Sequence, residues 1–241
     1  MNPYPEIKNI YRRDPDTHEV LQGSFSIPEF EYLFNNQWNA TEKVDGTNVR
    51  VQWWGKIAES LPAADITFKG RSDKCSALPP KLRDKLEVRF YERKLSKVFG
   101  STNVCLYGEG YGAGIQKGGG KYIPDGVDFI LFDVFVCEEF EKNGSFTGWW
   151  LKREDVDNIA LQLGIESVPI INEHGYMGIG GQTMALGKAI CIVSNGLTST
   201  FGDFEAEGLV LRPAVEMFAR NGNRIIVKVK ARDFSNVKNN G

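Results

Sequence analysis

The sharpest local feature that could do chemistry is the segment Glu42–Gly46 (EKVDG), which places a lysine before a turn-prone Asp-Gly pair. A lysine amine attacks an electrophile only without its proton, and cationic neighbours or desolvation lower its pKa enough to free it. Side chains two apart on extended backbone share a face, so we expect Lys43 and Asp45 to point together. An Asp-Gly pair also favours a tight turn, so a simple hairpin is the alternative interpretation of these residues taken alone.

Two carboxylates stand beside short apolar runs further along the chain. Glu109 follows the run Val104–Tyr107, and Glu207 comes directly before the run Gly208–Leu211. Runs of this length that are bounded by Gly, Pro, Asp or Asn are typical of β-strands. We therefore expect each carboxylate at the end of a strand.

A pair of lysines lies in an alternating segment near the C-terminus. In Arg224–Val229 and the residue after it, Ile225, Val227 and Val229 face one way, so Lys228 and Lys230 face the other. Two cations on one sheet face repel each other and favour an anionic neighbour such as a phosphate. The alternative interpretation is an ordinary exposed strand face.

The chain offers both strands and helices to position these residues. Helical periodicity extends over Pro80–Val98 and over Lys152–Leu163, and Gly164 fits a helix C-cap. Strand-like segments outnumber the helices and do not alternate with them regularly. We therefore expect an α+β fold with antiparallel β-sheets flanked by helices, rather than a doubly wound parallel sheet. The strand-like segments are Asn48–Trp54, Val104–Tyr107, Phe129–Val136, Gly208–Leu211 and Arg224–Val229.

Composition and charge fit a globular protein that has no strong overall electrostatic field. The chain has 241 residues, of which 41% are hydrophobic and 25% charged, enough to bury a substantial core. Its formal net charge is -2, so nucleic-acid binding must come from a local basic face. The stretch Lys81–Lys97, with seven basic residues, is one candidate, and a solvated helix face is the alternative.

The cysteines and the N-terminus indicate where such a protein works. The four cysteines lie far apart, unlike those of a zinc site or a disulfide framework, and this fits a reducing cytosol. Met1–Arg13 is polar and contains prolines, unlike a signal peptide, and no apolar segment is long enough to cross a membrane. We expect a cytoplasmic monomer without a membrane partner, either cellular or encoded by a phage and acting in the host cytoplasm. The cysteines are Cys75, Cys105, Cys137 and Cys191.

Five segments resemble, in order and spacing, the motifs of the covalent nucleotidyltransferase superfamily. This superfamily contains ATP-dependent DNA ligases, RNA ligases and mRNA capping enzymes. The five ordered matches are specific together, and they imply an ATP-grasp-like ligase fold with a single adenylyltransferase domain over residues 1–241. The segments are Lys43–Gly46, Tyr107–Glu109, Phe129–Asp133, Glu207–Gly208 and Lys228–Lys230.

The finer pattern is similar to the nick-sealing RNA ligase 2-type branch of that superfamily. Glu42 stands directly before the lysine, and Thr47-Asn48 follows the glycine, as in that branch. The resemblance also extends over three further segments. These are Gly70–Ser72, Gly108–Lys117, and Lys228–Lys230 followed by Phe234.

The resemblance implies a reaction in three steps. Lys43 attacks the α-phosphorus of ATP, expels pyrophosphate and holds AMP as a phosphoramidate. The AMP passes to a 5′-phosphate, and a 3′-hydroxyl then displaces it to close the strand. Each step moves charge onto phosphate oxygens, which Lys228 and Lys230 would stabilise, and Arg71 would be a partner for the nucleotide or the 5′-phosphate.

The same resemblance implies roles for the remaining residues. Glu109 would bind the ribose, and Glu207 would help to hold Mg²⁺ or Mn²⁺. Glu42 would read the amino edge of adenine, while Asp45 and Asp133 would organise the surroundings of the lysine. Phe129 would stack on the adenine, although an ordinary core phenylalanine is the alternative.

Contacts with the nucleic acid are also implied. Thr47 and Asn48 would touch the strand near the join, and Asn48 would touch the nucleotide as well. The glycine-rich run Gly110–Gly120 with Lys117 and Lys121 would follow a phosphate backbone, and a flexible surface loop is its alternative. The expected partner is RNA, as a nicked duplex or as free ends.

In one respect the sequence departs from these families. Only 13 residues follow Lys228 (241 minus 228), so we expect neither a C-terminal OB-fold nor a helical domain. The sequence leaves open whether this is a minimal enzyme or a catalytic fragment. A minimal DNA ligase, a guanylyltransferase and an inactive nucleotide- or RNA-binding homologue are the other readings.

Overall fold

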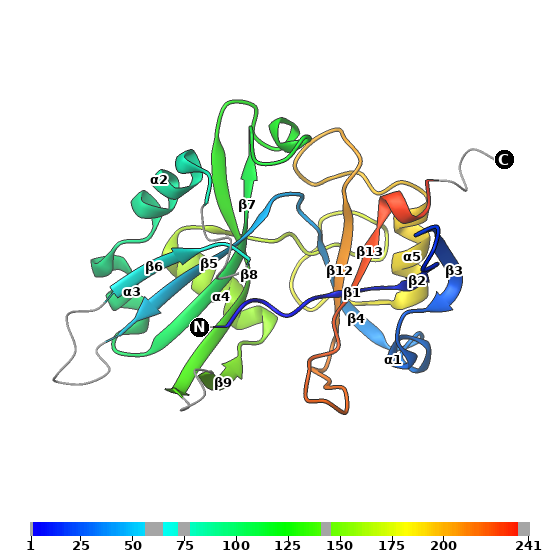
Figure 1. Cartoon of the computed structure of the whole chain (residues 1–241), viewed down its shortest axis with the longest axis horizontal. Coiled ribbons are helices and arrows are strands. Elements are labelled where there is room, and N and C mark those ends of the chain that lie inside the picture. Colours follow the sequence, from blue (N-terminus) through cyan, green and yellow to red (C-terminus); the bar gives the residue numbers. More distant parts are fainter. Residues whose placement is uncertain (1, 56–64, 72–77, 141–145, 236–241) are drawn as a thin grey trace. The chain divides into compact units, whose positions relative to one another are not determined.

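The computed structural model describes residues 2–55, 65–71, 78–140 and 146–235 (Figure 1). It shows an α+β fold in which most strand pairs are antiparallel, as the sequence predicts. The chain folds into two compact units. Unit 1 comprises Met1–Pro5 and Asp45–Val168, and unit 2 comprises Glu6–Val44 and Pro169–Gly241.

Unit 1 is built on a six-stranded sheet within the described residues. The order is β10-β8-β7-β5-β6, and β9 also pairs with β8. All neighbours are antiparallel except β10 and β8, which run parallel. The strands are β5 (Thr47–Trp54), β6 (Asp65–Lys69), β7 (Asn103–Gly112), β8 (Val127–Phe140), β9 (Phe146–Trp150) and β10 (Glu166–Ser167).

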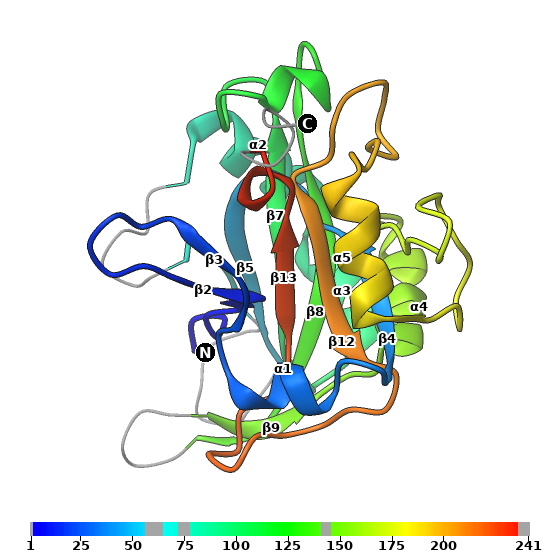
Figure 2. The ribbon, with the colours of Figure 1, turned by 90° about the vertical axis from the view of Figure 1, so that its right-hand side faces the viewer.

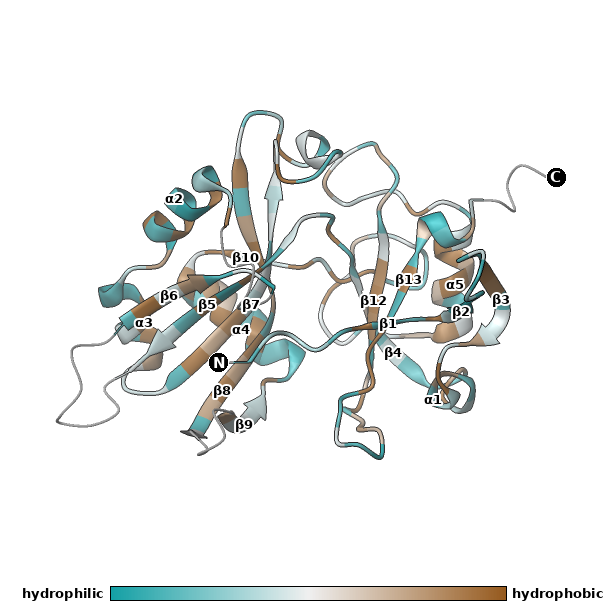
Figure 3. Cartoon of the chain, in the orientation of Figure 1, coloured by the Kyte–Doolittle hydropathy of each residue, from teal (hydrophilic) through white to brown (hydrophobic). Residues whose placement is uncertain are grey.

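Helices cover one face of this sheet and enclose the core of unit 1. Val49 and Val51 of β5 are fully buried there, together with Leu82 and Leu86 of α2. The strand β8 is largely hydrophobic and α2 mostly hydrophilic, as expected for a buried strand under a surface helix (Figure 3). The helices are α2 (Pro80–Arg89), α3 (Glu92–Phe99), η1 (Gly119–Lys121) and α4 (Arg153–Leu163).

The single helix predicted over Pro80–Val98 is wrong, because the structure divides it into α2 and α3. Phe90, which ends α2, has an extended backbone with φ −120°. This turns its ring into the core, where it is 2% exposed and packs edge-on against Phe129 at 5.3 Å between ring centroids. Burial of that ring therefore outweighs continuation of the helix. The predicted C-cap at Gly164 is confirmed, with a left-handed φ of 56°.

Unit 2 is built on a five-stranded sheet within the described residues, in the order β1-β13-β12-β4-β11. Among the strands described for this sheet, only β1 and β13 run parallel. A separate hairpin-like pair joins β2 and β3. The strands are β1 (Lys8–Asn9), β2 (Tyr11–Arg13), β3 (Val20–Phe25), β4 (Gln37–Glu42), β11 (Met184–Ala185), β12 (Gly208–Pro213) and β13 (Val227–Lys230).

One face of the unit 2 sheet carries the core, and α5 packs against β4, β12 and β13 (Figure 2). Buried residues alternate with partly exposed ones along β4 and β13, as the period of a half-buried strand requires. The predicted strand start at Arg224 is wrong, because Arg224 pairs with Phe218 in a separate bridge before β13 begins. The helices are α1 (Pro28–Tyr32), α5 (Leu186–Ser194) and η2 (Ala231–Asp233). In the described part of the chain, no helix is long and apolar enough to cross a membrane.

Candidate active site

Lys43 directly follows the last residue of β4 in unit 2. At this point the chain lies beside the start of β12. The backbone N–H of Lys43 donates to the carbonyl of Gly208 at 2.9 Å, which extends the strand pairing by one residue. Its Nζ lies 2.5 Å from Oε2 of Glu207. Two residues that the sequence predicts to share a site, 164 positions apart, are thus in contact.

Glu207 lies between two lysine amines. Its other carboxylate oxygen, Oε1, is 3.7 Å from Nζ of Lys230. Along β13, Val227 and Val229 are fully buried while Lys228 and Lys230 are half-buried, which confirms the predicted alternation. Burial lowers the pKa of Lys230 from its ordinary value, and the carboxylate of Glu207 partly offsets this by raising it.

Gly208 lets Lys43 and Lys230 approach the same carboxylate. Its φ is +143°, which side-chain-bearing residues rarely adopt, and it pairs with Lys230 in the ladder. A Cβ at this position would lie 2.0 Å from the carbonyl oxygen of Val229. The backbone conformation and the close approach of β13 therefore require a glycine at position 208, directly after Glu207.

Glu42 faces the core side of β4, together with Trp38 and Ala40, and is 1% exposed. Three donors from one loop satisfy its carboxylate. The Ser199 hydroxyl donates to Oε1 at 2.5 Å, and the Thr200 backbone N–H and hydroxyl donate to Oε2 at 2.8 and 2.6 Å. Sequence reasoning missed Ser199 and Thr200. The only signal available was a glutamate at a core-facing position, which needs partners.

In unit 1, Asn48 and Glu109 stand directly opposite each other in the β5–β7 pair. They lie on the sheet face opposite to Val49 and the helix-covered core. The amide oxygen of Asn48 is buried and has no hydrogen-bond partner among the residues that the structure describes. Buried polar atoms are nearly always satisfied, so this oxygen marks a place where a ligand donor fits.

The turn after the nucleophile segment is held by side chains from the glycine-rich region. The Asp45 N–H donates to the hydroxyl of Tyr122 at 3.1 Å, and Nε2 of Gln116 donates to the carbonyl of Gly46 at 2.9 Å. Both partners belong to unit 1. Sequence analysis assigned neither of them a role.

The glycine-rich run is built into the fold of unit 1. Gly112 ends β7, and Gly119 is buried so closely that a Cβ would lie 2.0 Å from the carbonyl oxygen of Gly112. One end of the run is therefore packed against β7, whereas Gly114, Gly118 and Gly120 have open space around their Cβ directions. Lys117 is exposed within this turn, and its contact with nucleic acid stays a prediction.

Phe129 is buried on the helix-covered side of the unit 1 sheet. It packs on Phe90, and its ring occupies the space that a side chain at Gly108 would need. Its strand neighbour Ile130 pairs with Glu109 instead. This position favours the alternative interpretation, a core phenylalanine, and stacking on adenine stays a prediction.

Arg71 is exposed just beyond β6, and the buried Arg50 supports its turn. Nε of Arg50 donates to the carbonyl of Gly70 at 3.0 Å. Ser72, part of the same predicted segment, and Cys75 lie outside the described residues. Asp133 is fully buried and accepts a hydrogen bond from the Tyr4 hydroxyl at 2.8 Å, and its role in organising the surroundings of Lys43 stays a prediction.

Part of the basic stretch has a structural role in unit 1. Lys85 and Arg89 of α2 both contact Asp128 of β8, at 3.5 and 2.6 Å. Lys81, Arg93 and Lys97 are exposed. Part of the stretch thus forms ion pairs that join α2 to the sheet, and part of it is a solvated surface.

Glu207 has the donor chemistry for a magnesium or manganese ion. Both ions prefer oxygen ligands, and magnesium is often held by one or two carboxylates with phosphate oxygens and water. Within the described ranges, no cluster of three or more His, Cys, Asp or Glu side chains could hold a metal alone. A single carboxylate completed by nucleotide phosphates fits the residues present.

Comparison with known proteins decides the family. The family model described as RNA ligase matches residues 36–230. The chain belongs to the RNA ligase family. A comparison with curated sequences gives no significant match.

Solved structures of Naegleria gruberi RNA ligase share the fold of this RNA ligase family member. A mutant with ATP and Mn matches with a TM-score of 0.58 and 18% identity, over 95% of this chain and 57% of that chain. The protein with PPi matches with a TM-score of 0.58 and 17% identity, over 99% and 60%. Another mutant, with AMP and Mn, matches with a TM-score of 0.57 and 17% identity, over 96% and 58%. The chain spans about 60% of the length of the proteins that it matches.

Proposed function

We propose that this chain is an ATP-dependent RNA ligase that forms a lysyl-AMP intermediate on Lys43. Membership in the RNA ligase family supports the class. The convergence of the amines of Lys43 and Lys230 on the carboxylate of Glu207 carries the assignment of residues. A nucleophilic amine beside a second cation suits attack on a phosphate, because the second cation stabilises the charge that develops on oxygen.

In the first step the neutral Nζ of Lys43 attacks the α-phosphorus of ATP. The P–N bond forms as the bond to the bridging oxygen breaks, and pyrophosphate leaves with the electron pair of that bond. The ion pair with Glu207 must open and the amine must lose a proton before attack. Lys230, with Lys228 two residues earlier on the same strand face, then stabilises the phosphate oxygens.

The remaining assignments follow the chemistry of each position. We assign Glu207 to Mg²⁺ or Mn²⁺, which when bound would neutralise charge on the phosphates. Asn48 and Glu109 offer an acceptor pair for ribose or base donors in unit 1. We propose Glu42 as the reader of the adenine amino edge, which requires the adenine amine to replace a donor of Ser199 or Thr200.

We assign the strand contacts to exposed or strand-end residues of unit 1. Thr47 and Asn48 open β5, Lys117 is exposed in the glycine-rich turn, and Arg71 is exposed beyond β6. These residues would hold the 5′-phosphate strand while AMP passes to it. A 3′-hydroxyl would then attack that activated phosphate and release AMP.

Incubation with α-labelled ATP and magnesium tests the first step. We expect wild type to carry a covalent AMP that is labile in acid and stable in base, and Lys43→Ala to carry none. Lys8→Ala, an exposed lysine of β1 in the same unit, is the matched control and should label like wild type. Equal labelling of Lys43→Ala would remove Lys43 from the mechanism.

A second experiment tests the substrate. Nicked duplexes with ribose or deoxyribose on the 3′ side of the nick are sealed in parallel, starting from a pre-adenylated 5′ end. An RNA ligase should prefer the ribose nick, because the 2′-hydroxyl and A-form shape distinguish RNA from DNA. Equal or faster sealing of the deoxyribose nick would assign the chain to DNA joining instead.

A further inference from the structure

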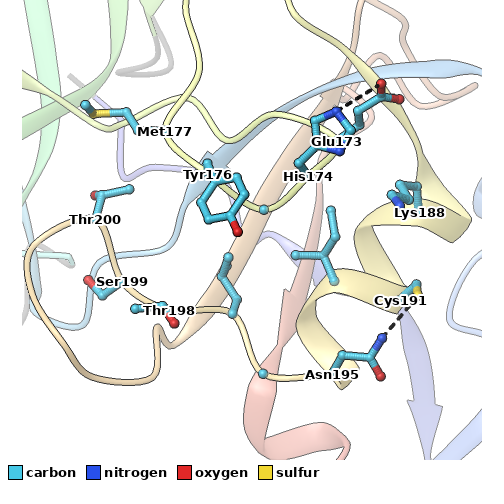
Figure 4. Close-up of a pocket in the computed structure, with 14 residues that line it drawn as sticks. Glu173, His174, Tyr176, Met177, Lys188, Cys191, Asn195, Thr198, Ser199 and Thr200 are labelled. Carbon is cyan, nitrogen blue, oxygen red and sulfur yellow. Dashed lines mark hydrogen bonds and ion pairs between the residues drawn. The ribbon is translucent and has the colours of Figure 1, made fainter.

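A second feature of unit 2 has the properties of a ligand site, and the residues assigned to adenylation do not line it. It is a cavity of about 640 Å³ between α5, the loop 172–178 and the segment 195–200 (Figure 4). This volume lies within the range of small-molecule and cofactor sites. Polar groups of Asn195, Thr198 and Ser199 line one side, and Tyr176 and Lys188 line the others.

The loop presents Tyr176 in a fixed position. Oδ1 of Asn172 accepts the backbone N–H groups of His174 and Tyr176 at 2.9 and 3.2 Å. The Asn172 N–H donates in turn to the carbonyl of Tyr176 at 2.9 Å. The side chain of Tyr176 is nevertheless 73% exposed. The turn that carries this large aromatic ring is already ordered by hydrogen bonds. A flat partner can therefore stack on the ring with little loss of conformational entropy.

The apolar character of the loop extends beyond the tyrosine. Met177 and Ile179 are 69% and 74% exposed, so three large apolar side chains stand in solvent within four residues. Contiguous exposed apolar groups on an ordered segment mark binding surfaces. Glu173 and His174 form the polar rim of the same loop, with Nε2 of His174 3.8 Å from Oε1 of Glu173.

Lys188 supplies the positive charge of the cavity. It is exposed on α5, and among the described residues its amine has no ion-pair partner. Figure 4 shows Lys188 on α5 and Tyr176 on the loop, both lining the cavity. An aromatic platform with a nearby lysine and amide or hydroxyl groups matches a nucleotide, which has a flat base, a phosphate and polar edges.

We propose that this cavity binds one unpaired nucleotide of a single-stranded polynucleotide, with the base stacked on Tyr176 and a backbone phosphate at Lys188. The choice of a polynucleotide rests on the proposed function, because a ligase must hold strand ends. Ser199 and Thr200 line the same cavity and hold Glu42, so an occupied cavity adjoins a residue of the proposed adenylation site.

Fluorescence anisotropy with a short labelled single-stranded RNA tests the stacking contact. Tyr176→Ala should weaken binding by about tenfold, since one base on an aromatic ring contributes on the order of a tenfold change or more. Tyr176→Phe keeps the ring and should bind like wild type. Tyr32→Ala removes a tyrosine of α1 that is 82% exposed, and serves as the matched control.

The salt dependence of the same binding tests the lysine. Each phosphate contact on a single strand contributes a slope of about −0.7 to log K against log salt. Lys188→Ala should therefore reduce the magnitude of the slope by about 0.7, whereas Lys8→Ala should leave it unchanged. Wild-type affinity and slope in both Tyr176→Ala and Lys188→Ala would overturn the proposal.

Cys191 provides a footprint at the cavity itself. Its thiol is exposed on α5 and lines the cavity, whereas Cys105 and Cys137 are buried. Saturating RNA should slow alkylation of Cys191, measured by mass spectrometry of its peptide, and AMP alone at the same nucleotide concentration should not. Equal protection by AMP would show that the cavity binds a free nucleotide and not a strand. No protection by RNA would refute the site.

These readouts separate the inference from the proposed function. Covalent labelling of wild type by ATP is measured in a different assay that involves no RNA. Absence of that label would refute lysyl-AMP formation while the RNA footprint at Cys191 would still stand. A normal label without RNA binding at the cavity would refute only the inference.

Discussion

Glu42 is a buried carboxylate whose hydrogen-bond donors come from Ser199 and Thr200. A hydrogen bond to a charged group contributes about 1.5–3 kcal/mol, more than one to a neutral acceptor. We therefore expect Ser199→Ala to lower the free energy of unfolding by about 2 kcal/mol, measured by urea denaturation. If Glu42 reads adenine, the same variant should also lose preference for ATP over GTP in covalent labelling.

Two other substitutions serve as comparisons for Ser199→Ala. Ser194→Ala removes a hydroxyl that donates to the neutral carbonyl of Cys191, and should cost about 1 kcal/mol or less. Thr200→Val removes the hydroxyl and keeps the backbone donor, so its effect should fall between the two. Equal losses for Ser199→Ala and Ser194→Ala would show that the hydrogen bond to Glu42 contributes no more than one to a neutral carbonyl.

At this scale the sequence predicts the charged residues of the site better than their partners. Lys43, Glu207 and Lys230 belong to ordered motifs, and the structure brings them together. Ser199 has no such signal, because a serine in a loop 157 positions after Glu42 has no periodicity or spacing that ties it to that residue. Alternation along β4 could only show that Glu42 needs donors.

Among the elements, the start of β12 depends on Gly208. Its φ of +143° and the 2.0 Å approach of the Val229 carbonyl to a would-be Cβ leave no room for alanine. Backbone strain of this kind costs about 1–3 kcal/mol, and β12 would also have to separate from β13. We expect Gly208→Ala to lower the free energy of unfolding by about 2 kcal/mol or more, measured by urea denaturation.

The matched control for Gly208→Ala is Gly180→Ala in the same unit. Gly180 has open space around its Cβ direction, and its φ lies outside the left-handed range. Its substitution should change the free energy of unfolding by less than about 1 kcal/mol. If both variants were equally stable, the close approach of β13 at Gly208 would not constrain the strand.

Element boundaries show where local patterns cease to predict structure. Residues 80–98 have a helical pattern throughout, and only burial of the Phe90 ring against Phe129 reveals the break. The strand pattern of residues 224–229 likewise hides the separate pairing of Arg224 with Phe218. In both cases a tertiary contact decides the boundary, whereas Gly164 caps α4 through local backbone geometry and is predictable.

At the scale of the whole molecule, each unit is assembled from two separate parts of the chain. The division falls after Pro5, Val44 and Val168, and no long low-complexity linker marks these points. Composition therefore gives no sign of it, and sequence analysis predicts a single domain. The family resemblance nevertheless predicts the α+β fold. Motif residues that are far apart in the sequence come together in the fold, and local propensity cannot predict such contacts.

The adenylation step requires a charged Lys230 in unit 2, and the pH dependence of labelling should reveal this. Labelling by ATP should fall at high pH once Lys230 loses its charge. Burial lowers the pKa of Lys230 below the ordinary 10.5, so the falling limb should begin at a lower pH than an exposed lysine would give. In Lys230→Arg the guanidinium stays charged, so that limb should move to higher pH, even though a different shape reduces the maximum rate. Initial labelling rates from about pH 7 to about pH 10 measure this limb, with Lys8→Arg as control. A falling limb that stays in place in Lys230→Arg would assign the limb to another group and remove Lys230 as the cation that stabilises the phosphate.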